Sequence, residues 1–232
     1  GQHTHQRGAH ACHRLRSCSR PIPSVWWPAP NDDKAFGVVR TAMNRHNAEM
    51  ARLRFSAITS ADGYVNDADG SFDWAVPSDE LHAVVNDHQR EIGTLLLGRR
   101  MYEVMRYWET APGDVPGPGG EFARIWRDSD KIIYSRTMDG VFGARTTLEA
   151  EFDPAAVSAL KALSVRDLGI GGPTLAAEAF AAGLVDDIHL FAHPVIVGGG
   201  TRALPDGIPM RLELVSAERI GDVVHTHHRV LR

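Results

Sequence analysis

Two short glycine-containing segments are the parts of this sequence best suited to bind a ligand. In LLLGRR an apolar run ends at Gly98 before a helical pattern; in LGIGGP another ends at Gly171-Gly172, before a helix expected near Pro173-Thr174. Glycine lets a backbone approach a ligand closely, and unpaired N–H groups at a helix start attract phosphate. Ligands of open α/β sheets bind at the carboxyl ends of strands, so two such junctions predict a dinucleotide, although either alone is more typical of an ordinary turn.

Three arginines follow buried strands close to the expected phosphates. Arg99 and Arg100 come directly after Gly98, and Arg136 follows the apolar run KIIYS. A guanidinium group matches a 2′-phosphate, which favours NADP over NAD, whereas a solvated arginine at a helix start is the simpler alternative for each. No G-x-G-x-x-G lies between a strand and a helix, so the sequence does not predict an ordinary Rossmann site.

The elements that must position these residues alternate between strands and helices. Strands are predicted at 52–58, 94–98, 131–135, 145–150, 167–172 and 186–200, helices at 78–92, 99–108, 153–163 and 173–184, and loops at 59–77 and 111–120. The segment 211–231 has two alternating stretches typical of an antiparallel pair. This order predicts an α/β fold with a mostly parallel central sheet, flanking helices and antiparallel C-terminal strands.

Five segments in this order carry a family resemblance: FSAITSADGYV, LLLGRRMYE, KIIYSRT, IGGPTLAAEAF and LVDDIHLFAHPVIVGGGT. They resemble the family that joins bacterial dihydrofolate reductases to the reductase domain of the bifunctional riboflavin-biosynthesis enzyme, and most closely its small stand-alone members. The resemblance covers nearly all of 50–232 and none of 1–49. It implies a dihydrofolate-reductase-like three-layer fold that binds NADPH.

The resemblance also implies roles for residues along one cofactor cleft. It places the phosphates at Gly98, Arg99 and Arg100, the adenosine end at Ser135 and Arg136, the pyrophosphate at Gly171, Gly172, Thr174 and Leu175, the nicotinamide at Ala57, and a mobile closing loop from Asp62 and Gly63. Dihydrofolate reductases often follow the double glycine with another glycine and a basic residue. This chain has Pro173-Thr174 there, which shifts phosphate recognition toward the arginines.

The substrate side of the expected site depends on the segment Trp74-Ala-Val-Pro77-Ser-Asp79. It resembles the Trp…Pro-x-Asp stretch before the first helix of dihydrofolate reductases, where the acid binds the pterin amino group and assists protonation. Asp79 is therefore the first candidate catalytic residue and Asp62 the second. An acid that the helix dipole favours in the first turn is the alternative explanation of Asp79.

The resulting expectation is an NADPH-dependent reductase that transfers hydride to a C=N or C=O bond of a small heterocycle or ribosylated pyrimidine-like compound. A true dihydrofolate reductase is one alternative, although the loop at 111–120 argues against it. An NADP-binding protein without turnover is the other. A homodimer through the apolar strand at 188–197 and the closing strands is expected, as in the riboflavin-related members.

Other chemistry is not predicted for this chain. His189 and His193 alternate with apolar residues and are interpreted as core or interface side chains, and His225 and His227 share a strand face without a complete ligand set, so no metal site is expected. No serine has a nucleophile elbow, which sets a hydrolase aside.

Charge and composition argue against several other classes of protein. Residues 1–49 carry a net charge of +4 and the rest −8, so the acidic body argues against nucleic-acid binding. No apolar run is long enough for a membrane helix, no signal peptide is recognised, and a cytoplasmic protein is the expectation. Residues 1–49, with Cys12, Cys18 and clustered prolines, are expected to be a disordered or non-native extension, whereas a zinc site there lacks the usual spacings.

Overall fold

The computed structural model describes residues 50–232, so the expectations for residues 1–49 lie outside the described range. The elements in chain order are β1 (Leu53–Ser60), β2 (Tyr64–Asn66), the 3₁₀ helix η1 (Asp73–Ala75), α2 (Asp79–Arg90), β3 (Ile92–Gly98), α3 (Arg99–Met105), α4 (Tyr107–Thr110), α5 (Pro118–Asp128), β4 (Asp130–Tyr134), β5 (Thr146–Glu149), α6 (Pro154–Leu163), β6 (Asp167–Gly171), α7 (Pro173–Ala181), β7 (Asp187–His193), β8 (Thr201–Arg202), β9 (Arg211–Ile220) and β10 (Val223–Leu231). Among these helices none is long and apolar enough to cross a membrane.

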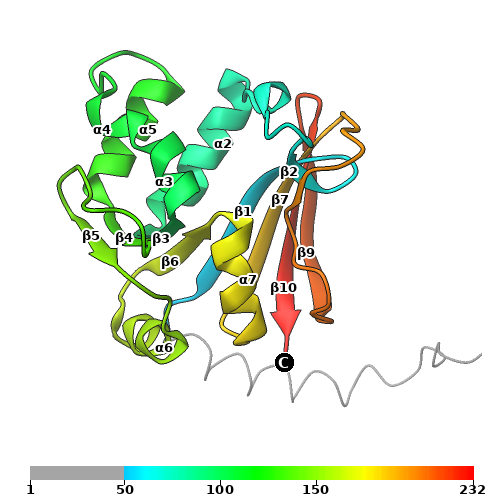
Figure 1. Ribbon diagram of the computed structural model, residues 1–232. Helices are drawn as coiled ribbons and strands as arrows, with labels where there is room; N and C mark the ends of the chain where they lie inside the picture. Colours follow the sequence, from blue (N-terminus) through cyan, green and yellow to red (C-terminus); the bar gives the residue numbers. More distant parts are fainter. Residues whose placement is uncertain (1–49) are drawn as a thin grey trace, which may run out of the picture. The chain divides into compact units, whose positions relative to one another are not determined.

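A central sheet of eight strands organises the described residues, in the order β5-β4-β3-β6-β1-β7-β10-β9 (Figure 1). The six strands from β5 to β7 pair in parallel, and β10 pairs antiparallel with both β7 and β9. The predicted mostly parallel sheet with antiparallel C-terminal strands is confirmed. A small separate ladder joins β2 to β8.

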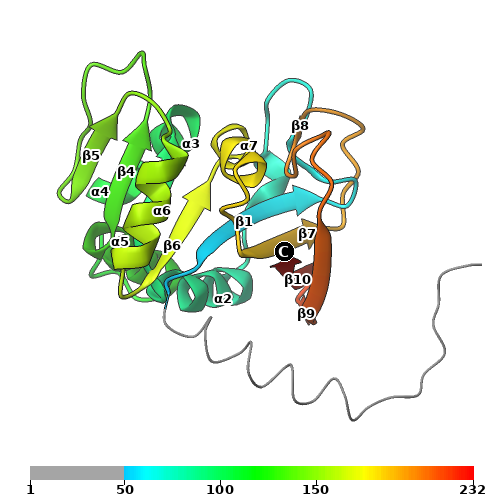
Figure 2. The same cartoon turned by 90° about the horizontal axis from the view of Figure 1, so that it is seen from below.

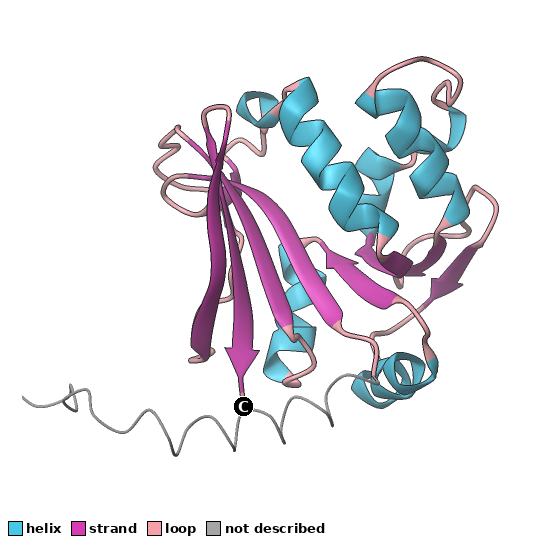
Figure 3. Cartoon of the chain, turned by 180° about the vertical axis from the view of Figure 1, so that it is seen from behind, coloured by secondary structure: helices cyan, strands magenta, loops and turns pink. Residues whose placement is uncertain are grey.

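Helices cover both faces of this sheet, which makes three layers (Figures 2 and 3). Successive residues of a strand point to opposite faces, so Leu96 packs on the side of α6 and α7 while Leu95 and Leu97 pack on the side of α3 and α5. Each face therefore has its own apolar core. A third cluster seats Leu81 of α2 against Phe191 of β7 and the β9–β10 pair.

Four predicted segments differ from the structure. The loop predicted at 59–77 contains β2 and η1, and the helix predicted at 99–108 is divided between α3 and α4. The loop predicted at 111–120 ends inside α5, which begins at Pro118 and buries Phe122 and Trp126, four residues apart on one face. Proline is well suited to the first helical position because its missing N–H would be unpaired there. The strand predicted at 186–200 ends at His193, because Pro194 follows and a tight turn joins Val195 N–H to the His193 carbonyl.

Candidate cofactor-binding site

The two glycine junctions lie side by side at the carboxyl edge of the sheet. Leu97 of β3 and Gly171 of β6 are register partners on neighbouring parallel strands. A β-carbon added at Gly98 would lie 3.6 Å from the Leu175 β-carbon, and one added at Gly172 would lie 3.4 Å from the Met101 β-carbon. The start of α3 therefore contacts the start of α7.

The glycines at these junctions serve different physical needs. Gly172 has φ 90°, a conformation that disfavours other residues. Gly171 is needed for space, since an added β-carbon would lie 2.9 Å from Leu97 Cδ2. Gly98 has φ −74° and is extended, so its backbone does not require glycine.

Neither junction has a side chain that caps its helix. The N-cap residues of α3 and α7 are Gly98 and Gly172, and no side chain accepts a hydrogen bond from the first turn of either helix. Thr174 is exposed in the first turn of α7, and Leu175 behind it is buried. Since first-turn N–H groups have no partner within their own helix, this edge presents backbone donors suited to an anion.

The arginine side of the edge is held by hydroxyl groups at the end of β4. Arg99 donates from Nη1 to Thr137 Oγ1 at 3.0 Å and from Nε to Glu103 at 2.8 Å. Ser135 Oγ lies 3.5 Å from Thr137 Oγ1. Arg100 and Arg136 are exposed nearby in the chain. Thr137 was not predicted as a site residue. The sequence did place its hydroxyl two residues after that of Ser135, in the stretch Ser135-Arg136-Thr137.

Asp62 anchors one loop to another. Its carboxylate accepts the backbone N–H of Gly198 at 2.8 Å and of Val197 at 3.2 Å, which ties the loop after β1 to the glycine turn after β7. A hydrogen bond with Ser60, together with these amides, lowers the pKa of Asp62. Gly63 next to it has φ 87°, and Ala57 lies half-buried on β1 opposite Leu190.

Asp79 is the first residue of α2, where Ser78 caps the helix by accepting the N–H of Leu81 at 3.2 Å. Asp79 is exposed. The helix η1 before it brings Trp74 edge-on to His193, the last residue of β7, with ring centroids 6.0 Å apart. The Trp74 and His193 rings each hold a buried nitrogen without a hydrogen-bond partner, so polar groups are available between η1 and the end of β7.

Three other histidines meet inside the domain, a grouping that the sequence analysis did not predict. His189 is buried, as the core interpretation predicts, but it lies beside His88 of α2 and His225 of β10. One ring nitrogen from each of the three lies within 4.8 Å of the others. Sequence reasoning missed His88, whose only signal was its place on the apolar face of a helix.

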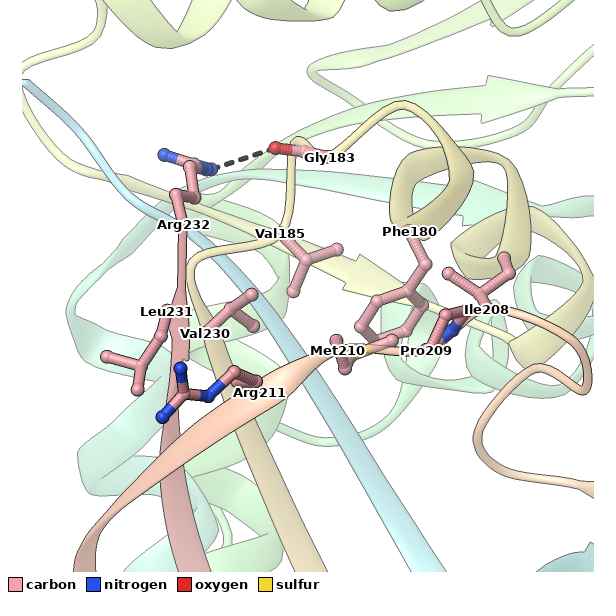
Figure 4. A pocket seen from close by; sticks show the side chains of 10 residues that line it. All are labelled: Phe180, Gly183, Val185, Ile208, Pro209, Met210, Arg211, Val230, Leu231 and Arg232. Atoms are coloured by element: carbon pink, nitrogen blue, oxygen red, sulfur yellow. Dashed lines mark hydrogen bonds between the residues drawn. The ribbon is translucent and has the colours of Figure 1, made fainter. Parts of the chain in front are cut away.

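A cavity of about 440 Å³ lies away from the glycine edge. It is lined on one side by Phe180, Val185 and Met210 and on the other by the end of β10, where Arg232 donates to the Gly183 carbonyl at 2.9 Å (Figure 4). Gly183 follows the carboxyl end of α7, whereas the glycine edge is at its start. This cavity is therefore separate from the predicted cofactor cleft.

The fold and the paired helix starts define an α/β protein of the dihydrofolate-reductase-like class. The RibD C-terminal domain family matches residues 51–226, and this chain belongs to that family. A sequence relative, the uncharacterized protein YyaP of Bacillus subtilis (strain 168), is 24% identical over 156 residues, which are 67% of this chain and 81% of YyaP.

Solved structures share this fold at low identity. A putative riboflavin biosynthesis protein from Shewanella sp. PV-4 has a TM-score of 0.61 at 19% identity, covering 78% of this chain and 99% of that one. A diaminohydroxyphosphoribosylaminopyrimidine deaminase/5-amino-6-(5-phosphoribosylamino)uracil reductase from Thermotoga maritima has a TM-score of 0.59 at 17% identity. The match covers 82% of this chain and 59% of the Thermotoga chain. Dihydrofolate reductase from Enterococcus faecalis, complexed with NADP(H), has a TM-score of 0.53 at 16% identity. The match covers 79% of this chain and 99% of the Enterococcus chain.

Proposed function

We propose that this chain is an NADPH-dependent reductase that transfers hydride to a C=N or C=O bond of a small heterocycle, with ribosylated pyrimidine-like compounds as the substrate class. The observation that carries the proposal is the contact between two uncapped helix starts, at Gly98 and Gly172, on adjacent strand ends. Family membership supports a reductase, and the named activity of the Thermotoga relative supports a pyrimidine-type substrate.

The residues at the carboxyl edge fit a dinucleotide. The pyrophosphate would be held by Gly171, Gly172, Thr174 and Leu175, because the first-turn N–H groups of α7 have no capping side chain. Arg99, Arg100 and Arg136 would bind the 2′-phosphate, with Ser135 at the adenosine end. The hydroxyl of Thr137 already orients Arg99, which reduces the cost of fixing its side chain when phosphate binds.

The nicotinamide end would lie beside Ala57, under the loop that starts at Asp62 and Gly63. The cofactor supplies the hydride, and the protein supplies binding, orientation and exclusion of water. Asp62 acts in this proposal by holding the loop against Val197 and Gly198. Asp79 at the start of α2 would hold the proton delivered to the substrate, directly or through a water.

Dihydrofolate is the second candidate substrate. The segment Trp74–Asp79 lies at the start of α2, as the resemblance to dihydrofolate reductases requires, and the Enterococcus enzyme shares the fold. The exposure of Asp79 argues for the broader substrate class, because a pterin amino group is bound best by a carboxylate shielded from water.

A titration and an assay together test the proposed function. NADPH and NADH are titrated into the full chain by fluorescence, and NADPH oxidation is then followed with dihydrofolate and with a panel of ribosylated pyrimidines and carbonyl compounds. We expect NADPH to bind more tightly than NADH and a pyrimidine compound to be reduced. Binding without turnover of any compound would indicate a nucleotide-binding protein, and absence of NADPH binding would overturn the proposal.

A further inference from the structure

A cluster of imidazoles lies between α2 and the C-terminal half of the sheet, built by elements far apart in the sequence. His88 extends from α2, His189 from β7 and His225 from β10. His189 Nδ1 and His225 Nε2 are 3.1 Å apart, and the His88 ring centroid lies 4.8 Å from that of His189 and 5.0 Å from that of His225. We refer to these three residues as the histidine cluster.

The spacing of the histidine cluster suits a tetrahedral metal ion. Zinc binds imidazole nitrogen at about 2.0–2.1 Å, which places two ligand atoms about 3.3 Å apart. The His189–His225 pair already has nearly this separation. All three ligand nitrogens lie within 4.8 Å of one another, so the half-buried His88 has to move inward by up to about 1.5 Å to complete the set.

Hydrogen bonding inside the cluster is incomplete. His189 and His225 are 3% and 2% exposed, and the two rings share a single hydrogen bond. His189 Nε2 and His225 Nδ1 are buried without a partner. A metal ion would replace this single hydrogen bond by binding His189 Nδ1 and His225 Nε2, and the unpartnered nitrogens are the opposite ones of each ring.

The surrounding charges permit a divalent cation. Arg54 of β1 faces His88 and His189, but its own charge is paired with Glu91 and Asp167. The carboxylates of Glu91 and of Glu218 on β9 favour positive charge at His88, because each acts to raise its pKa. His227 stacks on His189 at 4.2 Å, and its Nε2 lies 2.8 Å from Asp187 Oδ1.

The rings themselves are neutral near pH 7. Burial lowers the pKa of His189 to about 2 and that of His225 to about 4, and the neighbouring histidines contribute in the same direction. Burial also lowers the pKa of His88. Neutral imidazole is the form that binds a metal ion.

A small cavity provides a place for the fourth ligand. It has a volume of about 60 Å³, and its lining includes His88, His189 and Ser56. A water molecule occupies about 30 Å³ of liquid, so one fits beside the two imidazoles. We propose that His88, His189 and His225 bind a divalent ion of the zinc type, completed by a water from this cavity, which clamps α2 to β7 and β10.

The test must separate the cluster from other potential ligands of the same chain. The parent protein for the test is the full chain with its N-terminal histidines and cysteines replaced, as His→Asn at His3, His5, His10, His13 and His46 and Cys→Ser at Cys12 and Cys18. Metal is removed with a chelator, Zn²⁺ is returned, and bound zinc is measured by mass spectrometry after dialysis. Co²⁺ is titrated in parallel, because its visible absorption reports tetrahedral coordination.

We expect the parent to bind one equivalent of Zn²⁺, to give a tetrahedral Co²⁺ spectrum and to unfold at a higher temperature with zinc. His189→Gln and His225→Asn should each weaken binding at least about ten-fold. The control is His228→Asn, since His228 neighbours the cluster on β10 but its side chain points to the other face. It should bind zinc like the parent.

Two results would overturn the metal site: a folded parent that retains no zinc, or a His225→Asn protein that binds zinc as the parent does. Circular dichroism shows whether each variant folds. If the substitutions of His189 and His225 unfold the chain, zinc binding is measured with His88→Gln instead. His88 is half-buried on α2, so this variant removes a ligand without opening the core. Full zinc affinity in folded His88→Gln would also contradict the site.

Discussion

Leu97 and Gly171 are register partners on the parallel strands β3 and β6, so both strands end at the same level and their following helices start side by side. Because of this pairing, two glycine segments that are far apart in the sequence lie next to each other at the carboxyl edge of the sheet. A side chain at Gly171 would press on Leu97, and a side chain at Gly172 would need an unfavourable backbone conformation. The two glycines therefore allow the ends of β3 and β6 and the starts of α3 and α7 to pack closely together.

Arg99 should determine the preference for a 2′-phosphate. Arg99→Ala removes the guanidinium that Thr137 holds at the end of β4. We expect NADPH affinity to fall about ten-fold, which corresponds to about 1.4 kcal/mol, with little change for NADH. Fluorescence titration of both cofactors measures the effect, and Arg106→Ala at the other end of α3 is the control. Equal losses for NADPH and NADH would contradict this role.

Asp79 should act in the chemical step and leave cofactor binding unaffected. Asp79→Asn keeps the size of the side chain but removes the proton, so kcat should fall about 10²–10⁴-fold while the Kd for NADPH stays within about two-fold. Asp73→Asn in η1, also an exposed acid before α2, is the matched control and should retain activity. If Asp79→Asn turns over substrate at the parental rate, the proton comes from another group.

The histidine cluster should make the metal-free protein sensitive to acid. Unfolded histidine takes up a proton near pH 6.5, whereas in the folded chain burial holds the pKa of His225 at about 4 and that of His189 at about 2. His227 and His88 act in the same direction on both rings, and Arg54 does so on His189. The unfolded state therefore binds more protons below pH 6.5, and the free energy of unfolding falls as the pH falls.

The expected loss is up to about 1.4 kcal/mol per pH unit for each ring between pH 6.5 and about pH 4. Urea unfolding across this range, with a chelator present, measures it. A His189→Gln/His225→Asn protein should show a flatter dependence, and His228→Asn should resemble the parent. A parent whose stability is constant from pH 6.5 to 4.5 would rule out buried neutral rings.

The edge strand β9 should mediate self-association; the expected contribution of the strand at 188–197 is corrected, because β7 is paired on both edges, with β1 and β10. This strand is the last of the sheet, and Leu212 and Leu214, two residues apart on one face of it, are 37% and 58% exposed. Leu214→Glu places a charge in this apolar patch and should convert a homodimer to a monomer, as measured by light scattering after gel filtration. Leu163→Glu on α6, a leucine that is 83% exposed elsewhere, is the control. A monomeric parent would contradict the expected dimer.

Local patterns in the sequence were sufficient to predict most of the fold. Buried parallel strands appear as short continuous apolar runs, and Gly98 and Gly172 mark their junctions with helices. The helix α5 was not predicted at all, because the glycines and prolines of 111–120 indicate a loop, whereas Pro118 in fact begins a helix. Pro194 likewise ended β7 earlier than its apolar pattern indicated.

The histidine cluster could not be predicted from local patterns, because its geometry depends on register. The pairing of β10 with β7 places His227 opposite His189 and His225 opposite Phe191, which brings the His225 ring to His189 across the ladder. The third ring arrives from α2, whose position depends on the packing of Leu81 against Phe191. Contacts of this kind follow from the assembled sheet and from no single segment.

The central claim, a dinucleotide at the paired helix starts, is tested most directly by NADPH titration of Gly172→Asp. A carboxylate at this position would place a side chain and a negative charge where α7 presents its first-turn amides. Gly183→Asp, at another glycine with positive φ beyond the far end of the same helix, controls for backbone strain. We predict that Gly172→Asp loses NADPH binding while Gly183→Asp, if folded, retains it; unchanged affinity in Gly172→Asp would contradict the placement of the cofactor.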